Sequence, residues 1–429
     1  MRVLLTGANG FVGSHILGEL LEAGHEVVAA VRNPEALKRR FADVLAIDCD
    51  FNRDTSAEAW LSRLDGVDAV INCAGVLTSS PGQDIQAIHY QAPRALFDAC
   101  QQAGVKRVIQ ISAVSADEGA GTAYASSKMQ ADVYLRSLPL DWLVLKPSLI
   151  YSHGSYGGTS VLRGLAALPG CVPVVDKGEQ LFRPLHAKDL ARGVVALLSA
   201  DAPRRCTLEP AGPEVISMRD LLARLRSWMG LGPFRQWNVP HGLAEFGARI
   251  GDLLRIGAIN TTALRQLRFG NTGDPAQWIQ ATGFSPRSLQ SWQRREPSHV
   301  QDRWHARLFF LRPLCRVVLA LLWLVSGILG LTFGRDAALG LMQQAGFSDA
   351  FAVLTLVATC VLDLLIGVLL LVWPRVRVLG LAQLLIVGSY TLILTVLHPG
   401  LWADPLGPLL KNAPILALVL VWMALEDDR

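Results

Sequence analysis

Three glycines near the first residue constrain the fold of this chain more than any other feature. A short apolar run at residues 3–5 leads into Gly7, Gly10 and Gly13, and an amphipathic helical pattern follows directly. Glycines allow a tight turn and let backbone N–H groups approach a phosphate, and the dipole of a following helix favours that anion. A second apolar run at 26–31 completes the order strand, helix, strand. The pattern predicts a nucleotide-binding turn in a parallel α/β sheet.

Apolar runs alternate with helix-period segments through the first 150 residues or so. This alternation is typical of a doubly wound parallel sheet with helices on both faces. At about 150–300 the pattern loosens, which predicts a small C-terminal lobe, so we expect one α/β domain over 1–300. Its expected strands cover 2–6, 26–31, 43–47, 67–72, 105–112 and 141–146, and its expected helices include 84–103 and 123–137.

Apolar residues are concentrated after about residue 312, and they raise the mean hydropathy of the chain to +0.33. Four stretches of about twenty residues are each long enough to cross a hydrocarbon core of about 30 Å. The sequence therefore predicts an all-α domain over 301–429, built as a four-helix transmembrane bundle. The expected spans cover 314–333, 353–373, 378–397 and 406–425.

Basic residues are unevenly distributed around these spans. The connections at 334–352 and 398–405 carry only Arg335 and His398 against three aspartates. Positive charge accumulates on the cytoplasmic side of membrane proteins. We therefore expect a multi-pass protein with its soluble domain and both termini in the cytoplasm. The arginines on the expected cytoplasmic side are Arg303, Arg307, Arg312, Arg316, Arg375 and Arg377.

The overall composition argues against several classes of partner. The net charge is +4, and no basic helix or interleaving of arginine with aromatic residues points to nucleic acid. The seven cysteines are scattered without a C-x-x-C pair, so we expect neither a disulfide framework nor a metal site.

The first apolar stretch is a five-residue strand, which differs from the core of a signal peptide. Nothing in the sequence specifies the oligomeric state.

The residue after the second expected strand indicates which dinucleotide binds. Arg32 stands nineteen residues past Gly13, at the end of that strand. NAD-binding domains place a carboxylate near this point to bind the ribose 2′-OH, whereas an arginine suits a 2′-phosphate. Arg39 and Arg40 add positive charge. We therefore expect NADPH (NADP) in preference to NAD.

Further candidate contacts to the cofactor follow from the ends of the next two strands. Asp50, or Asp48 if the strand register shifts, is a candidate contact to adenine. The fourth strand ends in small residues, which would let a cofactor pass over the strand ends. The candidate cofactor-binding residues are Gly7, Asn9, Gly10, Phe11, Val12, Gly13, Arg32, Asp50, Cys73, Ala74, Gly75 and Lys128.

A tyrosine and a lysine carry the expected chemistry. Tyr124 and Lys128 are four residues apart in an expected helix, so both project from one face. A phenol has a pKa near 10, and a neighbouring ammonium lowers it by favouring the phenolate. Tyr124 is therefore the candidate general acid and base, and Lys128 can also reach the nicotinamide ribose. The candidate that hydrogen-bonds the reacting oxygen is Ser112, at the end of the fifth strand, or Ser115, three residues on.

These residues resemble the short-chain dehydrogenase/reductase superfamily, in its extended and atypical branches. The resemblance implies a Rossmann fold with Tyr124 as general acid/base and Lys128 as its partner. It covers about residues 1–200 and depends on the glycine spacing, on 72–75, on Tyr124 and Lys128, on 146–151 and on 182–190.

One departure from the superfamily pattern points to a particular branch. The extended branch carries a Ser-Ser or Ser-Thr pair where this chain has Ser112, Ala113 and Val114, and the loop from there to Tyr124 is short and glycine-rich. In this respect the chain is similar to the atypical group that includes the NADPH-binding accessory subunit of respiratory complex I. Some members of that group bind nucleotide without known catalysis.

About the last 115 residues resemble the DoxX-like family of bacterial four-helix membrane proteins. The resemblance depends on the segment at 409–414 and on the acidic ending at 426–429. It implies a bacterial inner membrane and an association with quinone-linked redox chemistry. Two ionisable residues, Asp363 and Lys411, fall inside expected spans, where a charge is costly. We expect them either to pair with each other or to hold a lipid or quinone head group.

These features lead to three functional hypotheses. The first is a membrane-anchored NADPH-dependent oxidoreductase acting on a CH–OH or carbonyl group of a quinone, isoprenoid or other lipid-borne substrate. The second is a non-catalytic NADPH-binding module that senses the cofactor or supports assembly of a membrane redox complex. The third is a nucleotide-sugar epimerase or dehydratase with tightly held NAD, which Arg32 disfavours.

Overall fold

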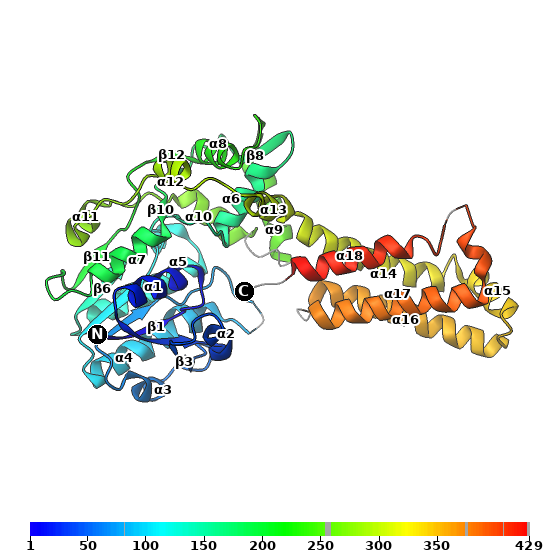
Figure 1. The fold of residues 1–429 in the computed structure, drawn as a ribbon, viewed down its shortest axis with the longest axis horizontal. Coiled ribbons are helices and arrows are strands. Elements are labelled where there is room, and N and C mark those ends of the chain that lie inside the picture. The colour runs from blue at the N-terminus through cyan, green and yellow to red at the C-terminus, as the bar shows by residue number, and fades with distance from the viewer. Residues whose placement is uncertain (81, 254–258, 374–375, 406, 427–429) are drawn as a thin grey trace. The chain divides into compact units, whose positions relative to one another are not determined.

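The computed structural model describes residues 1–429 except 81, 254–258, 374–375, 406 and 427–429. The chain divides into two compact units, Met1–Ala306 and Arg307–Arg429 (Figure 1). The first unit combines strands and helices, and the described part of the second is helical. Arg375 and most of the acidic ending, which the sequence analysis singled out, lie outside the described residues.

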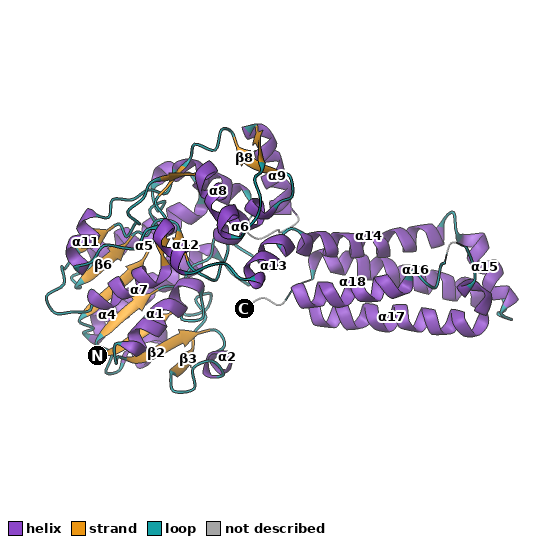
Figure 2. Ribbon diagram, turned by 45° about the horizontal axis from the view of Figure 1, so that its top comes forward, coloured by secondary structure: helices purple, strands orange, loops and turns teal. Residues whose placement is uncertain are grey.

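A seven-stranded sheet forms the centre of the first unit (Figure 2). Its order is β11–β6–β5–β4–β1–β2–β3, and all neighbouring strands run parallel. An order that starts at a central β1 and winds outward to both edges is that of the Rossmann fold. The expected doubly wound sheet is thus confirmed. Its strands are β1 (Arg2–Thr6), β2 (Glu26–Val31), β3 (Leu45–Asp48), β4 (Ala69–Asn72), β5 (Arg107–Ile111), β6 (Trp142–Leu145) and β11 (Cys206–Leu208).

Alternate residues of the central strands enter two separate hydrophobic cores. On β1, Val3 and Leu5 belong to one core and Leu4 to the other, and all three are fully buried. A parallel sheet that is covered on both faces requires apolar side chains on both sides of its strands. Side chains of α1 (Phe11–Glu22) and α7 (Ala187–Ala196) complete the first core, and those of α3 (Glu58–Leu61), α4 (Ala92–Ala103) and α5 (Ala123–Ser137) complete the second.

The strands begin and end within two residues of the expected ranges, and β11 is an addition that the sequence analysis did not contain. The helix expected at 84–103 is divided in the structure. A π-helical turn, η2 (Ala87–Gln91), precedes α4, and such turns occur frequently at functional sites. The remaining short elements are α2 (Pro34–Lys38) and the 3₁₀ turns η1 (Ser62–Leu64) and η3 (Glu118–Ala120).

The lobe has a core of its own, built around aromatic side chains. The rings of Trp228 and Trp292 lie 4.9 Å apart, and Tyr151 contacts Trp292 edge-on. Three two-stranded sheets surround this core: β7 (Ile150–Tyr151) with β10 (Leu185–His186), β8 (Cys171–Val175) with β13 (Arg235–Val239), and β9 (Leu181–Phe182) with β12 (Ile216–Ser217). The helices are α6 (Gly158–Ala167), α8 (Met218–Trp228), α9 (His241–Leu253), α10 (Thr261–Phe269), α11 (Ala276–Thr282), α12 (Leu289–Arg295) and α13 (Val300–Leu308).

A glycine allows one helix of the lobe, α11, to pack against the sheet domain. Gly193 on α7 lies directly against the indole ring of Trp278 on α11, which is fully buried. A Cβ atom at position 193 would lie 2.0 Å from Cζ2 of that ring. No side chain larger than hydrogen fits this contact without displacing the tryptophan.

The second unit contains three helices that are long and apolar enough to cross a membrane. They are α14 (Leu311–Leu331), α16 (Asp349–Val372) and α17 (Val376–Leu397), and they correspond to the first three expected spans. Large apolar side chains such as Leu321, Leu354 and Leu385 point outward, as they do on lipid-facing surfaces. The shorter elements are α15 (Arg335–Gln344), η4 (Pro399–Trp402) and α18 (Asn412–Leu425).

Close packing of α14 against α16 depends on glycine. A Cβ atom at Gly327 would lie 2.7 Å from the carbonyl oxygen of Cys360, and one at Gly367 would lie 3.1 Å from that of Ala320. Small residues let membrane helices approach until their backbones touch, which increases van der Waals contact where no hydrophobic effect operates.

The fourth expected span, 406–425, was too long. Among the described residues the helix there is α18, with 14 residues, and Lys411 precedes it instead of lying inside it. Pro414 falls in the first turn, where its missing N–H removes no helical hydrogen bond. The expected pair between Asp363 and Lys411 is also absent from the described residues: the Tyr390 hydroxyl donates to Asp363 Oδ1 at 3.5 Å.

Replacing Gly193 with alanine tests the contact between α7 and α11. The added methyl group overlaps the buried Trp278 ring, so we expect the free energy of unfolding to fall by about 1–3 kcal/mol. Thermal unfolding of the full chain in detergent measures this change. The matched control is Gly18→Ala on α1, where a Cβ meets no atom within 4 Å, and it should leave the stability unchanged or raise it. Equal melting temperatures for both variants would contradict the contact.

Candidate functional site

The three glycines after β1 bring separate backbone segments into contact. Gly7 has a φ of +66°, and a Cβ there would lie 2.9 Å from the carbonyl oxygen of Cys73. A Cβ at Gly13 would lie 2.1 Å from the carbonyl oxygen of Gly7. Helix α1 begins at Phe11, and its N-cap residue, Gly10, provides no side-chain cap. Because the turn has no side chain at these positions, its backbone and the helix N-terminus fit the phosphates of a dinucleotide.

A buried hydrogen-bond network sets the register of the strand ends beside this turn. The Thr6 hydroxyl on β1 donates to Asn72 Oδ1 on β4 at 2.6 Å, and Asn72 Nδ2 donates to Gln110 Oε1 on β5 at 2.7 Å. The Cys73 N–H donates to Thr6 Oγ1 at 3.1 Å. Three neighbouring strands are therefore fixed at their carboxyl ends, which is where ligands bind in sheets of this type.

The other candidate cofactor residues take up the following positions. Asn9 lies in the turn, Val12 in the first turn of α1, and 73–75 directly beyond β4. Arg32 is exposed and is the first residue after β2. Asp50 follows β3, and its Oδ1 accepts hydrogen bonds from the Asn52 backbone and side-chain amides.

Tyr124 and Lys128 lie on α5 beside the segment that follows β4. Lys128 is buried, and its Nζ donates to the Ile111 carbonyl oxygen at 3.1 Å and lies 5.8 Å from the centre of the Tyr124 ring. A Cβ at Gly75 would lie 3.4 Å from Lys128 Nζ. The structure thus brings together the Tyr–Lys pair and the candidate cofactor segment, which are about fifty residues apart in sequence.

The expected decrease in the pKa of Tyr124 is not found. Burial, together with the negative charge of Asp132, raises the pKa of the Tyr124 phenol to about 12. Burial also lowers the pKa of the Lys128 ammonium, which Asp132 opposes. The sequence-based expectation considered the attraction of the ammonium for a phenolate but omitted the cost of burying either charge.

The two candidate serines have different environments. Ser112 Oγ donates to Asp132 Oδ2 at 2.5 Å, and both residues are buried. Asp132 stands four residues after Lys128, so Tyr124, Lys128 and Asp132 share one face of α5. Burial raises the pKa of the Asp132 carboxyl to about 6. Ser115 is buried in the loop beyond β5, and no side-chain hydrogen bond of Ser115 occurs in the part of the chain that the structure describes.

His89 is a site residue that the sequence analysis missed. It lies in the π-helical turn η2, and its ring meets the Tyr124 ring edge-on at 5.4 Å. The Val76 N–H donates to His89 Nε2 at 3.0 Å, so in the neutral ring Nδ1 carries the hydrogen and donates to Ser127 Oγ, also 3.0 Å away. Burial and the nearby Lys128 charge lower the pKa of His89 to about 2, which keeps it neutral. A lone histidine in a helical segment gives no signal in the sequence.

The lobe covers the N-terminal end of α5. Gln266 Nε2 on α10 donates to Thr122 Oγ1 at 2.6 Å, and Thr122 caps the helix that carries Tyr124. Arg265 donates to the Gly121 carbonyl oxygen at 3.3 Å. The lobe is therefore fixed through polar contacts to the end of this helix that carries Tyr124.

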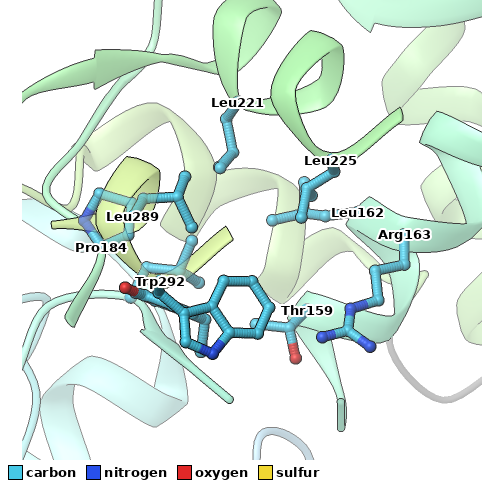
Figure 3. A pocket seen from close by; sticks show the side chains of 10 residues that line it. Thr159, Leu162, Arg163, Pro184, Leu221, Leu225, Leu289 and Trp292 are labelled. Atoms are coloured by element: carbon cyan, nitrogen blue, oxygen red, sulfur yellow. The ribbon is translucent and has the colours of Figure 1, made fainter. Parts of the chain in front are cut away.

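A small apolar cavity lies in the lobe core (Figure 3). Leucine side chains from α6, α8 and α12 surround it together with the Trp292 ring, and Tyr151 contributes from β7. Its volume of about 20 Å³ holds roughly one water molecule. Since most of its lining residues belong to the hydrophobic core of the lobe, the cavity is a packing gap and too small for a substrate.

Two protein families match separate parts of the chain. The family described as NAD(P)H-binding matches residues 7–199, and the DoxX-like family matches residues 320–420.

Relatives of known name match the N-terminal half. The ceramide reductase of Caulobacter vibrioides is 27% identical over 196 residues, which are 45% of this chain and 60% of that protein. NADH dehydrogenase [ubiquinone] 1 alpha subcomplex subunit 9 of Arabidopsis thaliana is 24% identical over 229 residues, 50% of this chain and 54% of that protein. The match thus spans less than two thirds of these relatives.

Solved structures share the fold of the first unit. A nucleoside-diphosphate-sugar epimerase from Staphylococcus aureus superposes with a TM-score of 0.55 at 19% identity, covering 68% of this chain and 99% of its own. A dTDP-glucose 4,6-dehydratase from Streptomyces venezuelae gives a TM-score of 0.54 at 19% identity, covering 71% and 97%. Together with the family matches, these findings show an NAD(P)-binding Rossmann domain followed by a C-terminal DoxX-like domain of membrane type.

Proposed function

We propose that this chain is a membrane-anchored, NADPH-dependent oxidoreductase that interconverts a carbonyl and an alcohol on a lipid-borne substrate. The observation that carries this proposal is that Tyr124, Lys128 and Gly75 lie close together at the carboxyl ends of the sheet strands. The glycine turn after β1 lies at the same end of the sheet. A proton donor beside a dinucleotide-binding segment is the arrangement that reduction of a carbonyl requires.

In the direction of reduction, the Tyr124 hydroxyl gives its proton to the substrate oxygen. Bound NADPH supplies the hydride that the carbonyl carbon accepts. Lys128, held by the Ile111 carbonyl oxygen, stabilises the phenolate left on Tyr124 and compensates for the burial that raises the pKa of this phenol. His89 fixes the edge of the Tyr124 ring and positions it through Ser127, whose Oγ donates to the Tyr124 carbonyl oxygen.

Ser115 is our candidate for the hydroxyl that polarises the substrate oxygen. Ser112 is already engaged, because its hydroxyl donates to the buried Asp132 carboxylate. Releasing Ser112 for a substrate would leave Asp132 without that donor in a buried position, which is costly. Ser115 carries no such commitment in the described structure.

The preference for NADPH over NADH is supported by Arg32. It stands exposed at the end of β2, where a ribose 2′-substituent lies in folds of this type, and Arg39 and Arg40 are exposed nearby in sequence. Asp50, bound to Asn52 and paired with Arg53, is a weaker candidate for an adenine contact because its carboxylate already has partners.

A lipid-borne substrate is supported by two observations. The chain carries its own apolar helices, and one named relative is a ceramide reductase, a protein named for action on a lipid. Quinones and isoprenoids are also held in bilayers, so an enzyme that acts on them must reach them there. The arginine distribution supports a cytoplasmic soluble domain at the bacterial inner membrane, where NADPH is available.

A second candidate function is a non-catalytic NADPH-binding module of a membrane redox complex. Its support is the similarity to a complex I subunit, together with the Tyr124 pKa of about 12, which disfavours a phenolate. The sugar-nucleotide epimerase or dehydratase alternative is supported by fold alone, and the arginine at position 32 argues against tightly held NAD.

Replacing Tyr124 with phenylalanine separates the first two functions. Loss of the hydroxyl removes the proton donor, so we expect acceptor-dependent NADPH oxidation to fall by about 10²–10⁴-fold with NADPH affinity nearly unchanged. The matched control is Tyr134→Phe, on the same helix, whose hydroxyl donates to Asp98 away from the site and whose loss should leave turnover intact. Unchanged turnover in Tyr124→Phe would support the non-catalytic module.

The raised pKa of Asp132 predicts a pH-dependent stability. The folded state binds the proton more tightly than the unfolded chain, since the pKa rises from 3.8 to about 6. The tighter binding of this proton adds to the free energy of unfolding. The stabilisation is fully present below about pH 4 and is lost as the pH rises through about 6. We therefore expect the melting temperature of Asp132→Asn, relative to the native chain, to increase from pH 4 to pH 7, by the equivalent of about 2 kcal/mol. A flat difference for Asp132→Asn would mean that this carboxyl is not buried as described.

A further inference from the structure

Helix α9 of the lobe presents its large apolar side chains to the outside. Leu243, Phe246, Ile250 and Leu253 are 49%, 62%, 39% and 81% exposed. Their spacing of three, four and three residues places them on one face of the helix. On an ordinary surface helix the large apolar residues face the core, so this face is reversed.

The inward side of α9 consists of small residues instead. The buried positions of the helix are Ala248 and Gly251, and a Cβ at Gly251 would lie 1.9 Å from the Ile259 carbonyl oxygen. Gly251 thus packs tightly against the backbone at Ile259, which precedes α10. The large apolar side chains therefore lie on the side of the helix that faces away from these two small residues.

Positive charge accompanies this apolar face. From Arg235 to Phe269 the sequence carries five arginines against one glutamate and one aspartate. Arg249 lies on α9 itself with 71% of its side chain exposed, and Arg265 and Arg268 on the neighbouring α10 are also exposed. Trp237, in the strand just before α9, is 54% exposed. An amphipathic helix flanked by arginine and tryptophan is the pattern that binds at the interface of anionic membranes.

We propose that the exposed face of α9 lies in the headgroup region of the same bilayer that holds the apolar helices of this chain. The covalent connection supports this occupant. The first unit ends at Ala306 and the apolar helix α14 begins at Leu311, so at most about 18 Å of extended chain separates the first unit from a membrane-spanning helix. A bilayer is therefore always within reach of the first unit, whereas a separate protein partner is not.

This docking would bring the lipid surface close to the candidate site. Helix α9 packs against α10, and α10 contacts Thr122 and Gly121 at the end of α5 that carries Tyr124. A substrate that leaves the bilayer at α9 would enter beside this end of the helix. This second statement rests on the proposed function, whereas the docking itself does not depend on catalysis.

Fluorescence quenching by lipids tests the docking in the full chain. Phe246→Cys is labelled with an NBD fluorophore, and the chain is reconstituted in nanodiscs of phosphatidylcholine and phosphatidylglycerol, with and without doxyl-labelled lipid. Cys171, the exposed cysteine of the described structure, is replaced by serine in every variant, and this parent measures background labelling. Leu243→Cys provides a second position on the same face. Val133→Cys, an exposed apolar position on α5, is the control.

Docking predicts about a twofold loss of NBD fluorescence at positions 243 and 246 with doxyl lipid, and little change at position 133. It also predicts weaker quenching when phosphatidylglycerol is omitted or salt is raised. A blue-shifted but unquenched label at 246 would show that protein covers this face, either a second copy or the second unit, and would overturn the proposal. An exposed, unquenched label would overturn it as well. Neither result depends on turnover, so the proposed function is tested separately by Tyr124→Phe.

Discussion

The contact of Gly13 with the Gly7 carbonyl, and of Gly7 with the backbone at Cys73, is the constraint on which the rest of the first unit depends. At these distances any Cβ would collide with backbone, which cannot move without displacing β1 or β4. The contact brings the start of α1 and the end of β4 to one point, and the Thr6–Asn72–Gln110 network holds the neighbouring strand ends in register there. The form of the glycine turn and the position of the segment that ends at Gly75 are consequences of the same packing.

Helix α5 combines the chemistry of the site with its stability. Tyr124, Lys128 and Asp132 follow one another at four-residue intervals. Lys128 is held by the Ile111 carbonyl oxygen and Asp132 by the Ser112 hydroxyl, both at the end of β5. Burial makes each of these groups expensive to charge, which raises the pKa of the tyrosine and of the aspartic acid and lowers that of the lysine. Lys128, the cationic partner of Tyr124, must therefore offset the desolvation cost that burial imposes on a charged phenolate.

The sequence allowed the glycine turn, the central strands and the Tyr–Lys helix to be predicted because each has a short, local pattern. Features that depend on distant contacts were missed or misjudged. β11 pairs with β6 through only three residues. His89 becomes relevant only when η2 packs on α5 and brings its ring against Tyr124. Helix α18 is shorter than the apolar stretch in the sequence that predicted it. The pKa of Tyr124 depends on burial that no spacing reveals. The spacing of Lys128 and Asp132 would have identified Asp132, had the helix face been followed one turn further.

The two units differ in their surroundings, because the second carries apolar helices that are long enough to cross a membrane. In our proposal the exposed apolar face of α9 brings the first unit into contact with the same bilayer. The central claim remains that the glycine cradle and the Tyr–Lys pair form one reductase site. Its most direct test is titration of the detergent-solubilised chain with NADPH and NADH by nicotinamide fluorescence, followed by the oxidation rate with long-chain ketones, aldehydes and quinones. The account predicts tighter binding of NADPH and oxidation that requires one of these acceptors. Tight binding without oxidation by any acceptor would contradict catalysis, and the absence of binding would contradict the site itself.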